Sequence, residues 1–180
     1  QAETTFLQAY NSGRLHHGWL ITGARGVGKA TLAWRIARFL LATPENAGEA
    51  PQTLDIAPDH PVARRMAALS EPRLFLLRTS WDANKKRFKT GITIDEIRKL
   101  KSSFNLSAAD GGRRVVIVDC ADDLNPNAAN ALLKLLEEPP RDVVLLLVCH
   151  QPSRLLATIR SRCTALRCAA VQPADIGQAL

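Results

Sequence analysis

Residues 23–29 carry the strongest chemical pattern in this sequence. They read GARGVGK and fit the G-x-x-x-x-G-K spacing. Glycines at Gly23, Gly26 and Gly28 let the backbone curl until several amides point at one anion, and the start of a helix adds a partial positive charge there. Lys29 would reach the outer phosphates of a nucleotide. We therefore predict a phosphate-binding loop made of these residues.

The residue after the lysine does not suit a metal ion. Ala30 stands where a Ser or Thr hydroxyl normally binds Mg²⁺. Thr31 follows and stays a candidate nucleotide-binding residue, although one step along a helix turns a side chain by about 100°. We therefore expect weak ATP and Mg²⁺ binding at most. The alternative that the loop is now mostly structural stays open.

A second acidic position follows the apolar run 115–118. Asp119 directly follows this run, at the position where nucleotide-binding proteins carry an aspartate that holds the water shell of a metal ion. Cys120 stands where ATP-hydrolysing proteins with such a phosphate loop carry a glutamate that polarises water. A neutral thiol is a poor base beside phosphates, because negative charge disfavours the thiolate. Asp122 and Asp123 are expected to face solvent or start a turn. The sequence therefore does not favour ATP hydrolysis by this chain itself.

Five apolar runs and the helical patterns between them supply the elements that position these residues. The runs do not alternate with polar residues, which is typical of parallel strands covered on both faces. The fold class is therefore α/β, with a parallel five-stranded sheet flanked by helices. The predicted strands are 18–23, 73–77, 115–118, 143–148 and 164–168, and the predicted helices are 30–42, 62–69, 94–104, 126–138 and 153–160.

Three local signals refine these elements. Thr93 and Glu96 form a capping-box pattern, in which the Thr oxygen accepts from the Glu96 amide and the Glu96 carboxylate accepts from the Thr93 amide. Asn125, followed by a proline, starts the next helix. The basic stretch 84–89 is expected to be a turn or an exposed hairpin.

Three further segments occur in an order that resembles the bacterial clamp-loader subunits of the AAA+ class. They are the run 127–140 (NAANALLKLLEEPP), the triplet 161–163 (SRC) and the run 13–20 (GRLHHGWL) before the phosphate loop. The resemblance covers about Phe6 to Leu180. It implies an AAA+ P-loop domain over residues 1–168 and the beginning of a truncated helical lid domain over 169–180.

The resemblance also implies a function. Arg162 would act in trans, as an arginine finger that stabilises charge on the ATP of a neighbouring subunit. The chain would be a weak or non-hydrolysing module that joins gamma/tau-like motor subunits and a delta subunit and helps load the sliding clamp on primed DNA. Polymerase chemistry would belong to another subunit of the holoenzyme. The alternative is an active motor-type ATPase, either a clamp-loader motor subunit or a branch-migration helicase.

The sequence departs from that family at two places. Residues 43–60 contain no cysteine, so the four-cysteine zinc module of many family members is not expected. His150 follows a strand where a small Thr or Asn is usual, and it is expected to hydrogen-bond a phosphate, to cap a helix or to lie at the surface. His16 and His17 are adjacent and their side chains are expected to diverge. We therefore predict no metal site, and reduced thiols at all four cysteines.

Composition narrows the partners. The 180 residues carry a net charge of +7, and residues 60–114 hold 13 Lys/Arg against 5 Asp/Glu, a net +8. Such a basic segment is compatible with the backbone of primer-template DNA. No apolar run approaches the roughly 18–20 residues of a membrane helix. We therefore expect a cytoplasmic protein without a membrane partner.

Overall fold

The computed structural model describes residues 1–43, 50–79, 81–82, 86–88, 91–107 and 112–169. Its centre is a five-stranded sheet in the order β2-β5-β6-β1-β7, with all neighbours parallel. The α/β class and the parallel five-stranded sheet predicted from the sequence are confirmed. The strands are β1 (Gly18–Thr22), β2 (Leu74–Leu77), β5 (Arg114–Val118), β6 (Val143–Cys149) and β7 (Thr164–Arg167).

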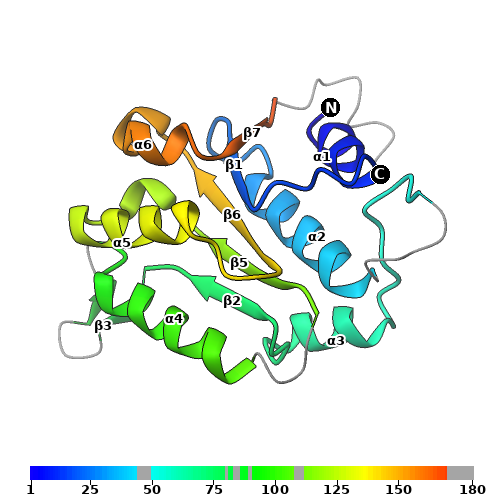
Figure 1. The fold of residues 1–180 in the computed structure, drawn as a ribbon, viewed down its shortest axis with the longest axis horizontal. Coiled ribbons are helices and arrows are strands. Elements are labelled where there is room, and N and C mark those ends of the chain that lie inside the picture. The colour runs from blue at the N-terminus through cyan, green and yellow to red at the C-terminus, as the bar shows by residue number, and fades with distance from the viewer. Residues whose placement is uncertain (44–49, 80, 83–85, 89–90, 108–111, 170–180) are drawn as a thin grey trace.

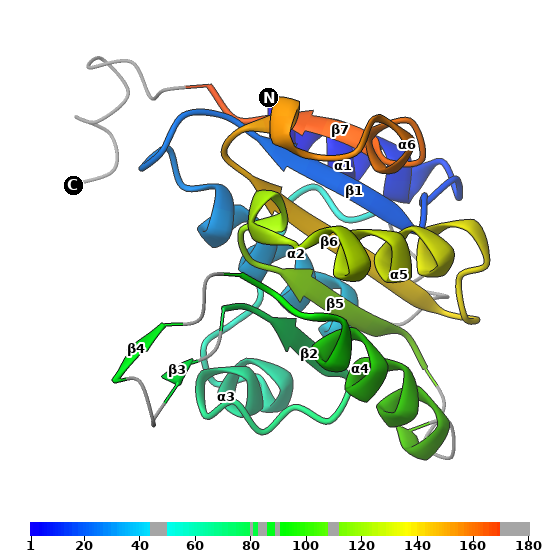
Figure 2. The ribbon, with the colours of Figure 1, turned by 90° about the vertical axis from the view of Figure 1, so that its left-hand side faces the viewer.

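Helices cover both faces of the sheet (Figures 1 and 2). Val115 and Ile117 of β5 belong to the core under α1, α2 and α3, whereas Val116 and Val118 belong to the core under α4, α5 and α6. Two buried faces explain why the strands are apolar throughout. The helices are α1 (Ala2–Asn11), α2 (Lys29–Ala42), α3 (Pro61–Ala67), α4 (Ile94–Ser107), α5 (Pro126–Glu137) and α6 (Ala157–Arg160).

Helix α1 is the element that the sequence patterns do not predict. Phe6 and Leu7 are its buried residues, and they are neighbours rather than residues three or four apart. Its stability comes from tertiary packing, because Phe6 contacts the rings of Trp19 and Phe39 at centroid distances of 5.0 and 6.5 Å. Ala2, Ala9 and Tyr10 also pack on this core at helical spacing, but only Phe6 and Leu7 are both large and buried, so the local signal is weak.

The helix-start signals are confirmed in part. The Asn125 side chain accepts a hydrogen bond from the Ala128 amide at 2.8 Å, as an N-cap does. The Glu96 carboxylate accepts from the Thr93 amide at 2.6 Å, which is one half of the expected capping box. The other half is wrong, because the Glu96 amide donates to the Thr93 backbone carbonyl oxygen at 3.2 Å, and the Thr93 hydroxyl donates to the Glu96 carboxylate at 3.0 Å.

Two other predicted segments differ in detail. The helix expected over 153–160 is divided into a 3-10 turn, η3 (Pro152–Arg154), and the short α6. In the basic stretch, β3 (Trp81–Asp82) pairs antiparallel with β4 (Arg87–Phe88), in agreement with a hairpin. The lid segment expected over 169–180 lies, apart from Ala169, outside the described residues.

Candidate functional site

The phosphate loop lies between the carboxyl end of β1 and the first turn of α2. Gly23 takes a backbone φ of +151°, and a Cβ atom placed on it would lie 2.4 Å from the Cys168 carbonyl oxygen. Gly28 is the N-cap of α2 at φ +84°, in the left-handed region that favours glycine. The loop therefore keeps a shape that only glycine allows at these two positions. Gly26 also has a positive φ and lies exposed at the loop tip.

Lys29 is turned into its own loop. It is the first residue of α2 and is only 3% exposed. Its Nζ donates hydrogen bonds to the carbonyl oxygens of Gly23, at 2.8 Å, and Ala24. The ammonium charge therefore lies beside the helix N-terminus, where both favour an anion. The residues of the loop fit a phosphate group.

The metal-binding half of such a site does not fit. Ala30 is exposed and has no hydroxyl to offer a cation. Thr31 is exposed as well, and it lines a pocket of about 470 Å³ beside the loop together with Val27, Gly28 and residues of α1 and β7. A pocket of this volume is within the range of small-ligand sites. Thr31 thus lies by the loop, as predicted, but along the pocket wall.

Asp119, Cys120 and His150 come together at the ends of two paired strands. Asp119 directly follows β5, and His150 directly follows β6. The Cys120 Sγ lies 3.4 Å from His150 Nε2 and 3.9 Å from an Asp119 carboxylate oxygen. His150 Nδ1 is buried without a hydrogen-bond partner. The catalytic-glutamate position is therefore occupied by a thiol that interacts with the imidazole.

The Cys120 thiol is neutral at physiological pH. Burial, followed by the negative charges of Asp119, Asp123 and Asp122, raises its pKa to about 11. A group with this pKa does not accept a proton from water near pH 7. The sequence-based prediction that Cys120 cannot replace a catalytic glutamate agrees with this environment.

One of the two alternatives for Asp122 is confirmed and the other is wrong. Asp122 lies in a 3-10 turn, η2 (Ala121–Asp123), but it does not face solvent. It is 8% exposed, and its two carboxylate oxygens accept hydrogen bonds from the backbone amides of His150 and Gln151 at 3.0 and 3.2 Å. Burial alone would raise its pKa, but these hydrogen bonds outweigh burial and lower the pKa below its ordinary value. Asp122 therefore fastens the turn after β5 to the segment after β6. Its spacing from Asp119 carries no signal that separates it from Asp123.

Arg162 lies at the amino ends of the strands, two residues before β7 begins. Its guanidinium forms an ion pair with Glu137 at 2.9 Å and donates to the Thr158 carbonyl oxygen at 3.1 Å, and both charged side chains are about 40% exposed. The Leu136 carbonyl oxygen lies 2.8 Å from His17 Nε2. The three segments that were widely separated in the sequence analysis thus meet at the start of β1.

The parallel register separates this arginine from the phosphate loop. β7 follows Arg162 and begins beside Trp19, and it ends beside Thr22, where the loop starts. Five residues of strand span about 16 Å. The Arg162 backbone and the phosphate loop therefore lie at opposite ends of β1. Figure 2 shows β1 and β7 running side by side. Asp119 and His150 lie at the loop end.

The histidine pair is also corrected. The rings of His16 and His17 do not diverge but stack, with centroids 4.4 Å apart. His16 Nδ1 contacts the Gly18 backbone, and His17 Nε2 lies within hydrogen-bond distance of the Leu136 carbonyl oxygen. Within the described ranges, no group of three or more possible metal ligands is found. All four cysteines are free thiols.

The fold and the loop define a P-loop α/β protein of the AAA+ type. A solved structure with this fold is a DNA polymerase III gamma-subunit-related protein from Thermotoga maritima. It has a TM-score of 0.62 and 20% identity, and the alignment covers 94% of this chain and 47% of that one. At this identity the comparison establishes the fold alone.

Sequence comparison identifies the family. The family model described as "DNA polymerase III, delta subunit" matches residues 1–172, so the chain belongs to that family. The chain is 40% identical over 152 residues to a protein from Pseudomonas aeruginosa and 35% identical over 155 residues to one from Escherichia coli K12, both named DNA polymerase III subunit delta'. The recognition made from the three sequence segments is confirmed.

The relatives are longer than this chain. The matches cover 84% and 86% of the chain but only 43% of each delta' protein. A more distant relative, the tau subunit from E. coli K12, is 30% identical over 160 residues, which is 23% of its length. The chain therefore spans less than half of the proteins it matches. Among the described residues, no helix is long and apolar enough to cross a membrane.

Proposed function

We propose that this chain is the P-loop module of a delta'-type clamp-loader subunit that does not hydrolyse ATP itself and supplies Arg162 to the ATP of a neighbouring subunit. The position of Arg162 carries this proposal. The side chain is partly exposed, and its residue lies at the amino end of the strands, whereas the chain's own phosphate loop lies at the carboxyl end. It can meet a nucleotide most directly on another subunit.

The ion pair with Glu137 suits such a role. A guanidinium presents donors in a plane that matches a carboxylate or a phosphate. A partly exposed pair of this kind contributes roughly 0–1 kcal/mol to stability. Glu137 therefore orients Arg162 in the free subunit, and the arginine can exchange this carboxylate for a γ-phosphate at little cost. There it would stabilise charge in the transition state of phosphoryl transfer.

The chain's own loop supports weak nucleotide binding without hydrolysis. Gly23, Gly28 and Lys29 fit a phosphate, and the adjacent pocket would accept the rest of a nucleotide. Ala30 and Cys120 leave the metal and the attacking water without their usual partners. The second candidate, an active motor-type ATPase, keeps Lys29 and Asp119 in its favour, but no described residue supplies the missing base.

A basic groove on the α4–α5 face is compatible with DNA in the assembly. It has a volume of about 330 Å³ and is lined by Arg98, Lys101 and Lys134 together with Asn127 and Asn130. Lysine, arginine and amide side chains commonly contact phosphate oxygens. We propose that this groove lies near the backbone of primer-template DNA when gamma/tau-like subunits, a delta subunit and the sliding clamp are present.

The test is reconstitution of the full subunit with those partners, followed by ATPase and clamp-loading assays on primed DNA. Arg162→Ala is expected to lower ATP turnover by about 10³-fold. Arg154→Ala, which removes an exposed arginine of η3, is the matched control and should leave turnover unchanged. Equal turnover of the assembled Arg162→Ala and wild-type complexes would refute the trans-acting role.

A further inference from the structure

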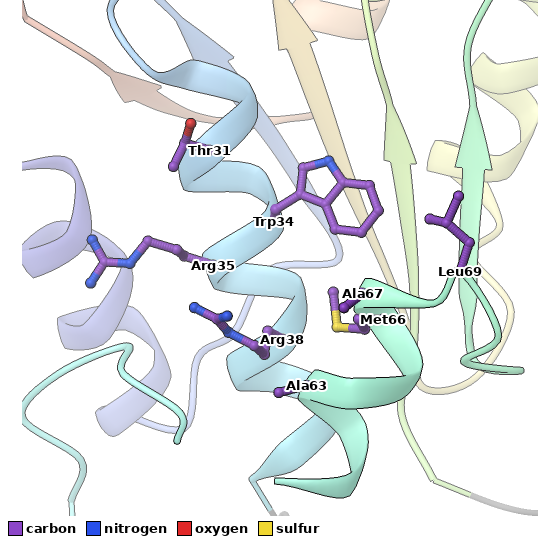
Figure 3. Close-up of a pocket in the computed structure, with 8 residues that line it drawn as sticks. All are labelled: Thr31, Trp34, Arg35, Arg38, Ala63, Met66, Ala67 and Leu69. Atoms are coloured by element: carbon purple, nitrogen blue, oxygen red, sulfur yellow. The ribbon is translucent and has the colours of Figure 1, made fainter. Parts of the chain in front are cut away.

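A pocket between α2 and α3 lies on the face of the sheet opposite α4 and α5 (Figure 3). Its volume is about 460 Å³. Trp34 of α2 leans over the turn of α3 that carries Met66 and Ala67, and Leu69 stands beyond them. The walls on this side are apolar. Arg35 and Arg38 line the side along α2.

Leu69 is exposed in a backbone conformation that disfavours it. It is 63% exposed, and its φ is +52°. Its amide donates to the Met66 carbonyl oxygen, and the Ser70 amide donates to the Arg65 carbonyl oxygen. This is the hydrogen-bond pattern of a Schellman helix end, whose left-handed position usually carries glycine. A leucine here costs stability and buries little of its side chain, so the fold does not explain its presence.

The charges around the pocket are unequal. Arg35 is neutralised by Glu3 and by Asp55, the latter at 2.7 Å. Among the described residues no carboxylate pairs with Arg38, and its Nε is buried without a hydrogen-bond partner. Thus one positive group remains uncompensated beside an apolar depression.

We propose that this α2–α3 pocket docks an acidic peptide segment of a partner protein, with one large apolar side chain between Trp34 and Leu69 and a carboxylate on Arg38. The charge pattern selects this occupant. A nucleic-acid strand carries a charge at every phosphate, whereas Arg38 is a single unpaired cation and suits one carboxylate better than a row of phosphates. The proposal does not depend on the role of Arg162, which lies on the α5–α6 side of the molecule.

Binding is measured by fluorescence anisotropy with the full chain. The probe is a short fluorescein-labelled peptide in which a single phenylalanine lies between aspartates. Three matched probes replace the aspartates by asparagine, replace the phenylalanine by alanine, or substitute a short single-stranded oligonucleotide for the peptide. We expect saturable binding of the first probe and at least about tenfold weaker binding of the other three.

Leu69→Gly separates docking from folding. Glycine is the residue that the left-handed position favours, so the thermal midpoint should stay equal or rise while peptide affinity falls by about tenfold. Arg38→Gln should weaken the acidic peptide by a similar factor and leave the asparagine peptide unchanged. Leu156→Ala and Arg154→Gln, at exposed positions elsewhere, are the matched controls and should bind the probe as the wild type does.

Three results would overturn the proposal. The first is no saturable binding of the acidic phenylalanine peptide. The second is oligonucleotide binding that is tighter than peptide binding and is weakened by Arg38→Gln but not by Lys134→Gln in the α4–α5 groove, which would assign the α2–α3 pocket to nucleic acid. The third is a loss of affinity in Leu69→Gly no larger than that in Leu156→Ala.

Discussion

The polar groups at the two ends of strand β1 are held in different ways. At its carboxyl end, the phosphate loop and the turn after β5 are fastened by buried contacts, among them the Lys29 hydrogen bonds and the Asp122 carboxylate. At its amino end, Arg162 is held mainly by one partly exposed ion pair and one carbonyl oxygen. We propose that the first end does not hydrolyse ATP, whereas the second presents a cation that can exchange Glu137 for a phosphate group of a neighbouring subunit.

This difference separates residues that stabilise the fold from positions that would matter only for ATP hydrolysis. Lys29 and Asp122 stabilise the protein itself, because their polar atoms would otherwise be buried without partners. Ala30 and Cys120 offer neither a hydroxyl for a metal nor a carboxylate for a water. Arg162 has little effect on the fold, so its motif is better explained by a neighbouring molecule.

The largest expected effect contrasts Arg162→Ala with Lys29→Ala in the assembled complex. Arg162→Ala should lower ATP turnover by about 10³-fold, because it removes charge stabilisation at another subunit's nucleotide. Lys29→Ala should leave turnover within about twofold in complexes of equal subunit content, because the chain's own site does not hydrolyse ATP. Steady-state phosphate release measures both. A larger loss with Lys29→Ala would favour the motor-ATPase alternative.

Gly23→Ala tests the rigidity of the loop. The new Cβ would lie 2.4 Å from the Cys168 carbonyl oxygen, a backbone atom that cannot move without shifting β7. We expect a loss of about 2–4 kcal/mol in the free energy of unfolding, measured with urea. Gly26→Ala has open space around its Cβ and should cost only about 1 kcal/mol, from its φ of +82°. Equal losses would show that the close approach to β7 does not matter.

Asp122→Asn tests the buried carboxylate. An asparagine can accept only one of the two backbone hydrogen bonds well, so stability should fall by about 1–2 kcal/mol at pH 7. The pKa of Asp122 in the folded chain lies below its ordinary value of 3.8. Its stabilising effect is therefore present above that value and is lost as the pH falls through the folded-state pKa.

Urea unfolding of both proteins between pH 7 and the acid limit of folding should show the two free energies converging only below about pH 4. Asp123→Asn is the control at the neighbouring carboxylate. A difference between Asp122→Asn and the wild type that does not change with pH would contradict the assigned hydrogen bonds.

Ala30→Ser has the smallest expected effect. Its hydroxyl would return one oxygen ligand for Mg²⁺, and we expect Mg-ATP to bind up to about tenfold more tightly by calorimetry. ATP with a chelator should show no such gain. Ala24→Ser, in the same loop, is the control. An equal gain without Mg²⁺ would mean that the hydroxyl acts on the loop rather than on the metal.

The sequence by itself determined the local elements. The spacing of Gly23, Gly28 and Lys29 predicts the loop, and the apolar runs predict all five strands of the sheet, because both depend on contacts or backbone angles within a few residues. The segment order also identified the family. Divided helices such as 153–160 escaped this reasoning, since residue periodicity cannot place their breaks.

Only the tertiary structure decided which polar residues are linked. Asp122 and Asp123 are equivalent in sequence, yet Asp122 is the one that meets the segment after β6. Arg162 forms an ion pair with Glu137 and lies far from the phosphate loop. In a parallel sheet, residues that precede strands lie at the amino ends of the strands, and residues that follow strands lie at the carboxyl ends. Such relations depend on strand order and register, which no short stretch of sequence contains.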